Sequence, residues 1–220
     1  MHFDRLHFRL AGRHRSAALA RFDPATCYAR LHELAATLDG QPWMVVSGLV
    51  EPLTNGGFTR AHSDIDIAIP QDNLEAAAVA ALRDGYVLTT RIFRTHLTRA
   101  LDVEGHLRVR PGPSSRRCRR LRLWRLTADG ELDERVVPSY IDVFPYVLSD
   151  RKIWILDSGQ RLDVRRPLAL RVTLPGGATI PVEDPYYVEA LRLSRCQGTA
   201  RGDRAVEREP PASAVHDGWW

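Results

Sequence analysis

Two aspartates stand two positions apart in an apolar stretch of the sequence. Residues 62–70 read HSDIDIAIP, in which Asp64 and Asp66 alternate with isoleucines. Successive residues of a strand point to opposite faces of a sheet, so both carboxylates share one face, about 7 Å apart at Cα. Like charges on one face repel, and a hard divalent cation with oxygen ligands relieves that repulsion. The spacing predicts a metal site; two solvated aspartates on an edge strand are the alternative.

Two further segments favour the metal site. The buried run WMVV is followed by Ser47-Gly48, where small residues let backbone N–H groups approach a phosphate. Downstream, the stretch YIDVFPY places Asp142 between Ile141 and Val143 in a second apolar strand. A third carboxylate there would complete an oxygen cage for one or two Mg²⁺ ions, or Mn²⁺, which can clamp a phosphoryl transfer. Taken alone, Asp142 could equally be a solvated strand residue.

The elements that must position these residues follow from breaks and periodicity. Asp23 with Pro24 begins a helix that we expect to end near Leu38, and Asp72 is expected to cap a helix that ends at Gly85. Residues 86–146 alternate as strands do, which predicts an α+β fold with a mixed sheet flanked by helices and a small C-terminal helical extension capped by Asp184. The expected divisions are an N-terminal segment 1–22, a catalytic domain 23–160, a strand and helix extension 161–198, and a disordered tail 199–220.

Composition limits the class of protein. The chain has 220 residues and a net charge of +4, and its 31 basic residues include a single lysine, so arginine usage explains much of the charge. Three cysteines without CxxC spacing predict neither a disulfide framework nor a cysteine zinc site. We expect a cytoplasmic protein without a membrane span. The C-terminal part is short for a complete acceptor pocket, so an oligomer or a partner chain could complete it.

The motifs resemble the nucleotidyltransferase superfamily that includes DNA polymerase beta. Its signature is a small-residue turn, a short helix, a strand reading hDhDh and a third Asp on a later strand. Ser47-Gly48, Asp64-Ile65-Asp66 and Asp142 occupy those places, although the family usually has Gly-Gly or Gly-Ser at the turn. The resemblance covers about residues 43–146 and implies a metal-dependent transferase with that fold.

One branch of the superfamily resembles the segment before the aspartates. Aminoglycoside and lincosamide nucleotidyltransferases often read TRxHxDhD, which is similar to the stretch from Thr59 to Asp66 with Arg60 and His62 in place. This resemblance implies transfer of a nucleoside monophosphate from an NTP onto a hydroxyl of an antibiotic or another small molecule. Transfer onto tRNA, by a toxin-like enzyme, is a related alternative.

A second branch, the LicD and fukutin family, resembles more of the chain. Gly57-Phe58, the stretch IDVFP at 141–145 and the later PVEDPYYVEALR look like its motifs, up to about residue 198. The family's Trp-Asp-Asp run is replaced by Ala61-His62-Ser63. We rank this resemblance first; it implies transfer of phosphocholine or a phospho-alditol from a CDP-activated donor to a glycan or small hydroxyl acceptor.

Both resemblances imply the same site. Asp64 and Asp66 would hold Mg²⁺ against the donor's diphosphate, and Asp142 would be a further metal ligand or the base that takes the acceptor proton. The residues expected to face the phosphates are Ser47, Gly48, Thr59 and Arg60.

An arginine-rich stretch, residues 116–125, offers another partner. Its arginines with Trp124 could bind RNA or a polyanionic glycan, whereas alternation with leucines favours a hairpin with one packed and one solvated face. A non-enzymatic binding module that uses this surface is a further alternative, which the presence of all three aspartates disfavours.

Overall fold

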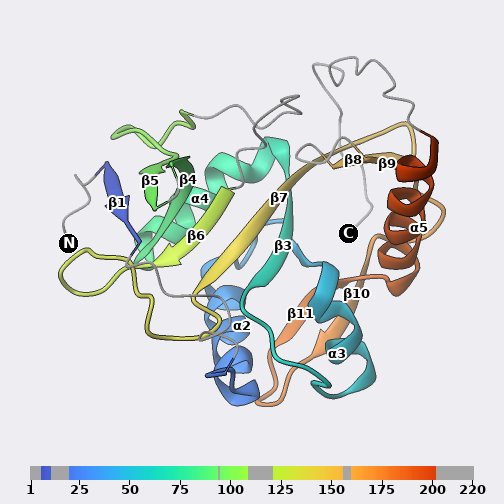
Figure 1. The fold of residues 1–220 in the computed structure, drawn as a ribbon, viewed down its shortest axis with the longest axis horizontal. Helices are drawn as coiled ribbons and strands as arrows, with labels where there is room; N and C mark the ends of the chain where they lie inside the picture. Colours follow the sequence, from blue (N-terminus) through green and yellow to red (C-terminus); the bar gives the residue numbers. More distant parts are fainter. Residues whose placement is uncertain (1–5, 11–19, 94, 109–120, 156–159, 202–220) are drawn as a thin grey trace.

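One mixed β-sheet organises the described part of the chain (Figure 1). The computed structural model describes residues 6–10, 20–93, 95–108, 121–155 and 160–201. Within these ranges the sheet has eleven strands, and helices lie against it, so the expected α+β class with a mixed sheet is confirmed. None of the helices found in these ranges has the length and apolarity needed to cross a bilayer.

The main path of the sheet runs β1-β5-β4-β6-β7-β3-β2-β11-β10, and β8 and β9 extend it from the far end of β7. Pairing is antiparallel except between β3 and β7 and between β11 and β2. The strands are β1 (His7–Arg9), β2 (Met44–Val45), β3 (Ile65–Pro70), β4 (Tyr86–Phe93), β5 (His96–Arg99), β6 (Leu121–Arg125), β7 (Tyr140–Ser149), β8 (Lys152–Ile155), β9 (Gln160–Asp163), β10 (Ala169–Thr173) and β11 (Thr179–Glu183).

The helix starts show where local sequence decides the structure. Asp23 caps α2 (Pro24–Thr37), as expected, because its carboxylate accepts from the N–H groups of Ala25 and Thr26. Asp72 does not cap α4 (Leu74–Arg83): it lies in a 3₁₀ turn, and Asn73 occupies the N-cap position. The remaining helices are α3 (Val50–Asn55) and α5 (Pro185–Arg201). Helix α5 therefore includes residues 199–201, which we had assigned to the tail.

The two faces of β3 have different neighbours. Ile65, Ile67 and Ile69 are at most 1% exposed and pack with residues of α2 and α4 in the main core. The intervening residues, Asp66 and Ala68, point to the other face. Alternation along one strand thus separates a dry, helix-covered face from the face that carries the carboxylates.

A buried tyrosine joins helix α5 to the sheet. Tyr187 is 1% exposed and packs with Tyr146 and Leu148 of β7. Its hydroxyl accepts from the N–H groups of Arg165 and Arg166, each at 3.0 Å, and donates to the carbonyl of Arg166 at 2.7 Å. This side chain fixes the start of α5 on the loop between β9 and β10.

We expect Tyr187→Phe to lower the free energy of unfolding by about 1 to 3 kcal/mol, because two backbone N–H groups lose their acceptor. Urea unfolding followed by circular dichroism measures the change. The matched control is Tyr186→Phe, at a neighbouring and more exposed side chain, for which we expect a change within about 0.5 kcal/mol. Equal effects of the two substitutions would contradict this role of the Tyr187 hydroxyl.

Candidate functional site

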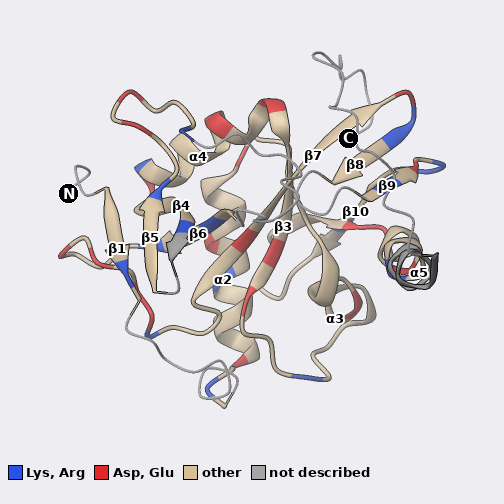
Figure 2. Cartoon of the chain, turned by 45° about the horizontal axis from the view of Figure 1, so that its top comes forward, with Lys and Arg blue, Asp and Glu red and all other residues tan. Residues whose placement is uncertain are grey.

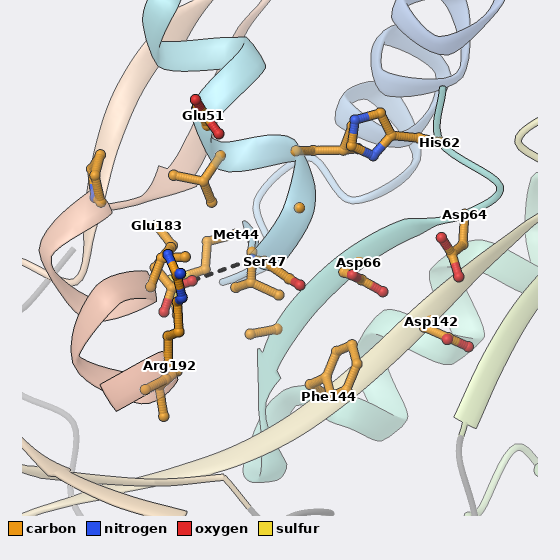
Figure 3. Close-up of a pocket in the computed structure, with 18 of the residues that line it drawn as sticks. Met44, Ser47, Glu51, His62, Asp64, Asp66, Asp142, Phe144, Glu183 and Arg192 are labelled. Atoms are coloured by element: carbon orange, nitrogen blue, oxygen red, sulfur yellow. Dashed lines mark hydrogen bonds between the residues drawn. The ribbon is translucent and has the colours of Figure 1, made fainter. Parts of the chain in front are cut away.

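Three aspartates converge on the face of the sheet opposite α2 and α4. Strands β3 and β7 run parallel, and their register sets Asp66 directly beside Asp142. Asp64 directly precedes β3, and Figure 3 shows the three carboxylates on this face. One oxygen from each of the three lies within 4.8 Å of the others. Figure 2 shows the acidic positions of β3 and β7 side by side in the middle of the sheet. Oxygen donors at this spacing fit a hard divalent cation.

Neighbouring side chains hold these carboxylates in place. The Asp64 carboxylate accepts from the hydroxyls of Ser63, at 3.1 Å, and Tyr140, at 3.2 Å. Asp142 is 3% exposed and accepts from Nε of Arg122 at 2.6 Å. Burial, the largest cause, raises the pKa of Tyr140 to about 12, so the phenol remains a hydrogen-bond donor at neutral pH. The cluster is therefore oriented before any ligand binds.

The turn after β2 has an unusual backbone. Ser47 has a φ of +64°, which lies in the left-handed region that residues other than glycine rarely adopt. Its N–H donates to the carboxylate of Glu183 at 3.4 Å, and Glu183 is 5% exposed (Figure 3). The Ser47 N–H, which we expected to face a phosphate, is thus directed to a buried carboxylate of β11.

Gly48 lies under two side chains of the loop before β3. A Cβ atom built on Gly48 would come 2.7 Å from Nη2 of Arg60 and 3.5 Å from Cε1 of His62. Residue 48 must therefore be a glycine if the Arg60 side chain is to keep this position. A guanidinium beside a glycine at the start of a turn is a suitable partner for phosphate oxygens.

His62 is a core residue of this loop. Its ring packs against Phe22 and Phe58, each with ring centroids 5.8 Å from its own. It is 5% exposed, and its Nε2 has no hydrogen-bond partner among the described residues. Burial, and then the charge of Arg60, lower the pKa of His62 below its usual 6.5, so the ring is neutral at pH 7.

A cavity of about 1270 Å³ joins the carboxylates to the Gly48 turn. This volume exceeds the roughly 300 to 1,000 Å³ that is typical of single small-molecule sites. The wall away from the aspartates is largely apolar and comes from β2, β3, β7, β8 and α5. Its apolar members are Met44, Val46, Ala68, Phe144, Ile155, Val188 and Leu191.

Six of the seven expected site residues line this cavity: Ser47, Gly48, Arg60, Asp64, Asp66 and Asp142. Thr59 is exposed in the loop before β3 and is not part of the lining. Glu183 also lines the cavity, and its position in the PVEDPYY stretch did not predict it as a site residue. Glu183 ends the apolar strand β11. It could be identified as a site residue only from the pairing of β11 with β2, which the sequence pattern does not show.

The arginine-rich stretch was expected to be a solvated face or a polyanion-binding surface. Residues 116–120 lie outside the described ranges. Arg122 pairs with Asp142 and Arg125 pairs with Glu33, so both described arginines of the stretch are engaged in ion pairs. Trp124 is 3% exposed and stays within the core beside Tyr140.

Comparisons with known proteins return similar structures only. No protein-family model matches the chain, and no curated protein matches it. Among solved structures, the lincosamide antibiotic adenylyltransferase LnuA is 15% identical with a TM-score of 0.46, covering 77% of this chain and 85% of its own. The antibiotic-resistance factor ANT(2'')-Ia is 13% identical with a TM-score of 0.44, and the match covers 84% of this chain and 79% of that protein.

A candidate nucleotidyltransferase from Thermotoga maritima is 14% identical with a TM-score of 0.45, covering 82% of this chain and 93% of its own. The named structures are thus nucleotidyltransferases at low identity. The LicD and fukutin resemblance, which we had ranked first, receives no support from these comparisons.

The buried His62 gives the stability of the fold a specific pH dependence. Because the pKa of His62 is lower in the folded than in the unfolded chain, the unfolded chain binds the proton first as pH falls below 6.5. The contribution of His62 is thus present above pH 6.5 and is lost as pH falls toward the folded pKa. We expect the advantage of wild type over His62→Gln in urea unfolding to shrink between pH 7.5 and pH 5.

His106 supplies a control of opposite sign. The hydrogen bond that the His106 ring donates to the Glu75 carboxylate raises the pKa of His106, so the contribution of His106 to stability is present below pH 6.5 and is lost as pH rises. The advantage of wild type over His106→Gln should therefore grow on acidification. A difference between wild type and His62→Gln that does not change with pH would contradict the burial of a neutral His62 ring.

Proposed function

We propose that this chain is a metal-dependent nucleotidyltransferase that moves a nucleoside monophosphate from a nucleoside triphosphate onto a hydroxyl of a small molecule. The observation that carries the proposal is the set of three carboxylate oxygens within 4.8 Å of one another, at the wall of a cavity that also contains Gly48 and Arg60. Hard oxygen ligands beside a guanidinium are what phosphoryl transfer from a nucleotide requires.

Each residue has a separate task in this proposal. Asp64, Asp66 and Asp142 hold one or two Mg²⁺ ions, with Mn²⁺ as a substitute. A divalent cation bound there would neutralise the charge that develops on the donor phosphates. Arg60 lies over Gly48 and donates to the phosphate oxygens from its guanidinium.

Asp142 fits the task of a metal ligand better than that of a base. Its Oδ1 accepts a hydrogen bond from Nε of Arg122 at 2.6 Å, which fixes the direction of the carboxylate. A base for the acceptor hydroxyl must approach the substrate freely, whereas Asp142 is 3% exposed. We therefore assign it to the cation.

The donor is the point on which the two sequence resemblances differ. NTP and CDP-alcohol donors both contain a pyrophosphate linkage that the same three carboxylates could serve. The triphosphate reading is supported by the stretch from Thr59 to Asp66, because its Arg60 and His62 both converge on Gly48. The arginine and the histidine of the TRxHxDhD pattern would thus hold the Ser47-Gly48 turn, where the phosphates are proposed to bind.

Loss of the metal ligands should abolish transfer without unfolding the protein. We expect Asp64→Asn and Asp66→Asn to lower turnover by about a thousandfold, because several kcal/mol of transition-state stabilisation are lost. Pyrophosphate release with Mg²⁺ is the assay, and circular dichroism reports folding. Asp39→Asn, at an exposed position after α2, is the control and should keep full activity. Folded Asp64→Asn and Asp66→Asn variants with wild-type turnover would refute the assignment.

A donor panel separates the two branches. Protein with Mg²⁺ is incubated with ATP, CTP, CDP-choline and CDP-ribitol in turn, with lincomycin and tobramycin, the molecules named for structures of this fold type, as first acceptors. Turnover or metal-dependent protection by triphosphates alone supports the proposal. Protection by CDP-alcohols alone would replace it with the LicD reading, and strongly salt-dependent RNA binding would favour tRNA as acceptor.

Gly48→Ala tests the place of Arg60. The added methyl group would stand 2.7 Å from Nη2 of Arg60 and must displace it. Losing one charge-assisted hydrogen bond, worth about 1.5 to 3 kcal/mol, should weaken Mg·ATP binding by roughly tenfold or more in calorimetry. Gly57→Ala is the matched control, because nothing lies within 4 Å of its Cβ. Unchanged affinity in Gly48→Ala would remove Arg60 from the phosphate site.

A further inference from the structure

Arg122 lies in one row with two of the site's aspartates. The register of β6 and β7 sets Arg122 beside Asp142, and the register of β7 and β3 sets Asp142 beside Asp66. The three residues therefore occupy neighbouring positions across three adjacent strands. Side chains in register on adjacent strands point to the same face of a sheet, so Arg122 faces the carboxylates rather than the solvent.

The contacts of Arg122 connect both ends of the carboxylate cluster. Its Nε donates to Oδ1 of Asp142 at 2.6 Å, and the two side chains are 13% and 4% exposed. Its guanidinium carbon lies 4.2 Å from the ring centroid of Tyr140. The hydroxyl of Tyr140 in turn donates to Oδ2 of Asp64 at 3.2 Å.

The cluster needs positive charge even without a metal ion. Three carboxylate oxygens within 4.8 Å of one another repel, and the repulsion is stronger at a partly buried site than in water. The Arg122 guanidinium, which is hydrogen-bonded to Asp142, the most buried of the three carboxylates, offsets part of that repulsion. When a divalent cation enters, the same guanidinium becomes a neighbouring like charge.

We propose that Arg122 is the counter-cation of the metal-free cluster, so that Arg122 and a divalent cation oppose each other at the same carboxylates. The inference rests on the proposed function for the identity of the cation. Removing Arg122 has two opposite consequences: the metal-free protein loses stability, and the cluster binds a divalent cation more tightly. A residue with a merely structural role would not strengthen metal binding when it is removed.

The first test measures Mn²⁺ affinity by electron paramagnetic resonance, without any substrate. We expect Arg122→Met to bind Mn²⁺ about tenfold more tightly than wild type, within the usual range of coupling between two sites. Arg122→Lys, which restores the charge, should return the affinity toward wild type. Should Arg122→Met fail to fold, Arg122→Gln removes the charge and keeps a donor. Equal or weaker affinity in the uncharged variant would overturn the proposal.

Arg125→Met is the matched control for charge and strand. Arg125 lies three residues further along β6 and pairs with Glu33. Its replacement should lower stability and leave the Mn²⁺ affinity unchanged. An equal gain in Mn²⁺ affinity in Arg125→Met would show that the effect comes from overall charge and would also overturn the proposal.

The second test needs no metal. In the presence of chelator, Arg122→Met should lower the midpoint of thermal unfolding by about 10 °C, because the buried Asp142 carboxylate loses its guanidinium partner. In an Asp142→Asn background the same substitution should cost much less. If the cost is equal in both backgrounds, Arg122 is not the counter-cation. Absence of Mn²⁺ binding in wild type would refute the proposed function alone, since this cycle still decides the role of Arg122.

Discussion

Mutual repulsion among three carboxylates is the constraint on which this structure depends. Asp64, Asp66 and Asp142 offer oxygens within 4.8 Å of one another on the face of the sheet away from α2 and α4. The isoleucines of β3 fill the opposite face, and the parallel pairing with β7 sets the register. Packing of one face therefore holds the charges of the other at fixed spacing, which a flexible loop could not do.

The Ser47-Gly48 turn, the proposed phosphate side of the site, is held from two directions. Below the turn, the carboxylate of Glu183 accepts the N–H of Ser47, whose backbone is in the left-handed region. Above it, Arg60 and His62 lie against Gly48. A backbone in an unfavourable conformation persists only where surrounding contacts hold it, and such positions are common at functional sites. Residues far apart in the sequence thus fix a turn that the local sequence alone would not.

The features that could be predicted from the sequence are those that depend on neighbouring residues in the chain. Alternation placed Asp64 and Asp66 on one face, and the apolar setting of Asp142 indicated a second strand. Strand register and long-range pairing are not encoded in such patterns, so the inward direction of Arg122 and the burial of Glu183 beneath Ser47 were missed. The local pattern also does not show that Phe22 and Phe58 enclose the ring of His62.

The most direct measurement is anomalous diffraction from crystals of the protein soaked with Mn²⁺. The account predicts a strong anomalous peak about 2 Å from carboxylate oxygens of Asp64, Asp66 and Asp142. The same peak should vanish in crystals of Asp66→Asn. A peak at another place, or the three side chains directed apart with no ion between them at saturating Mn²⁺, would contradict the central claim.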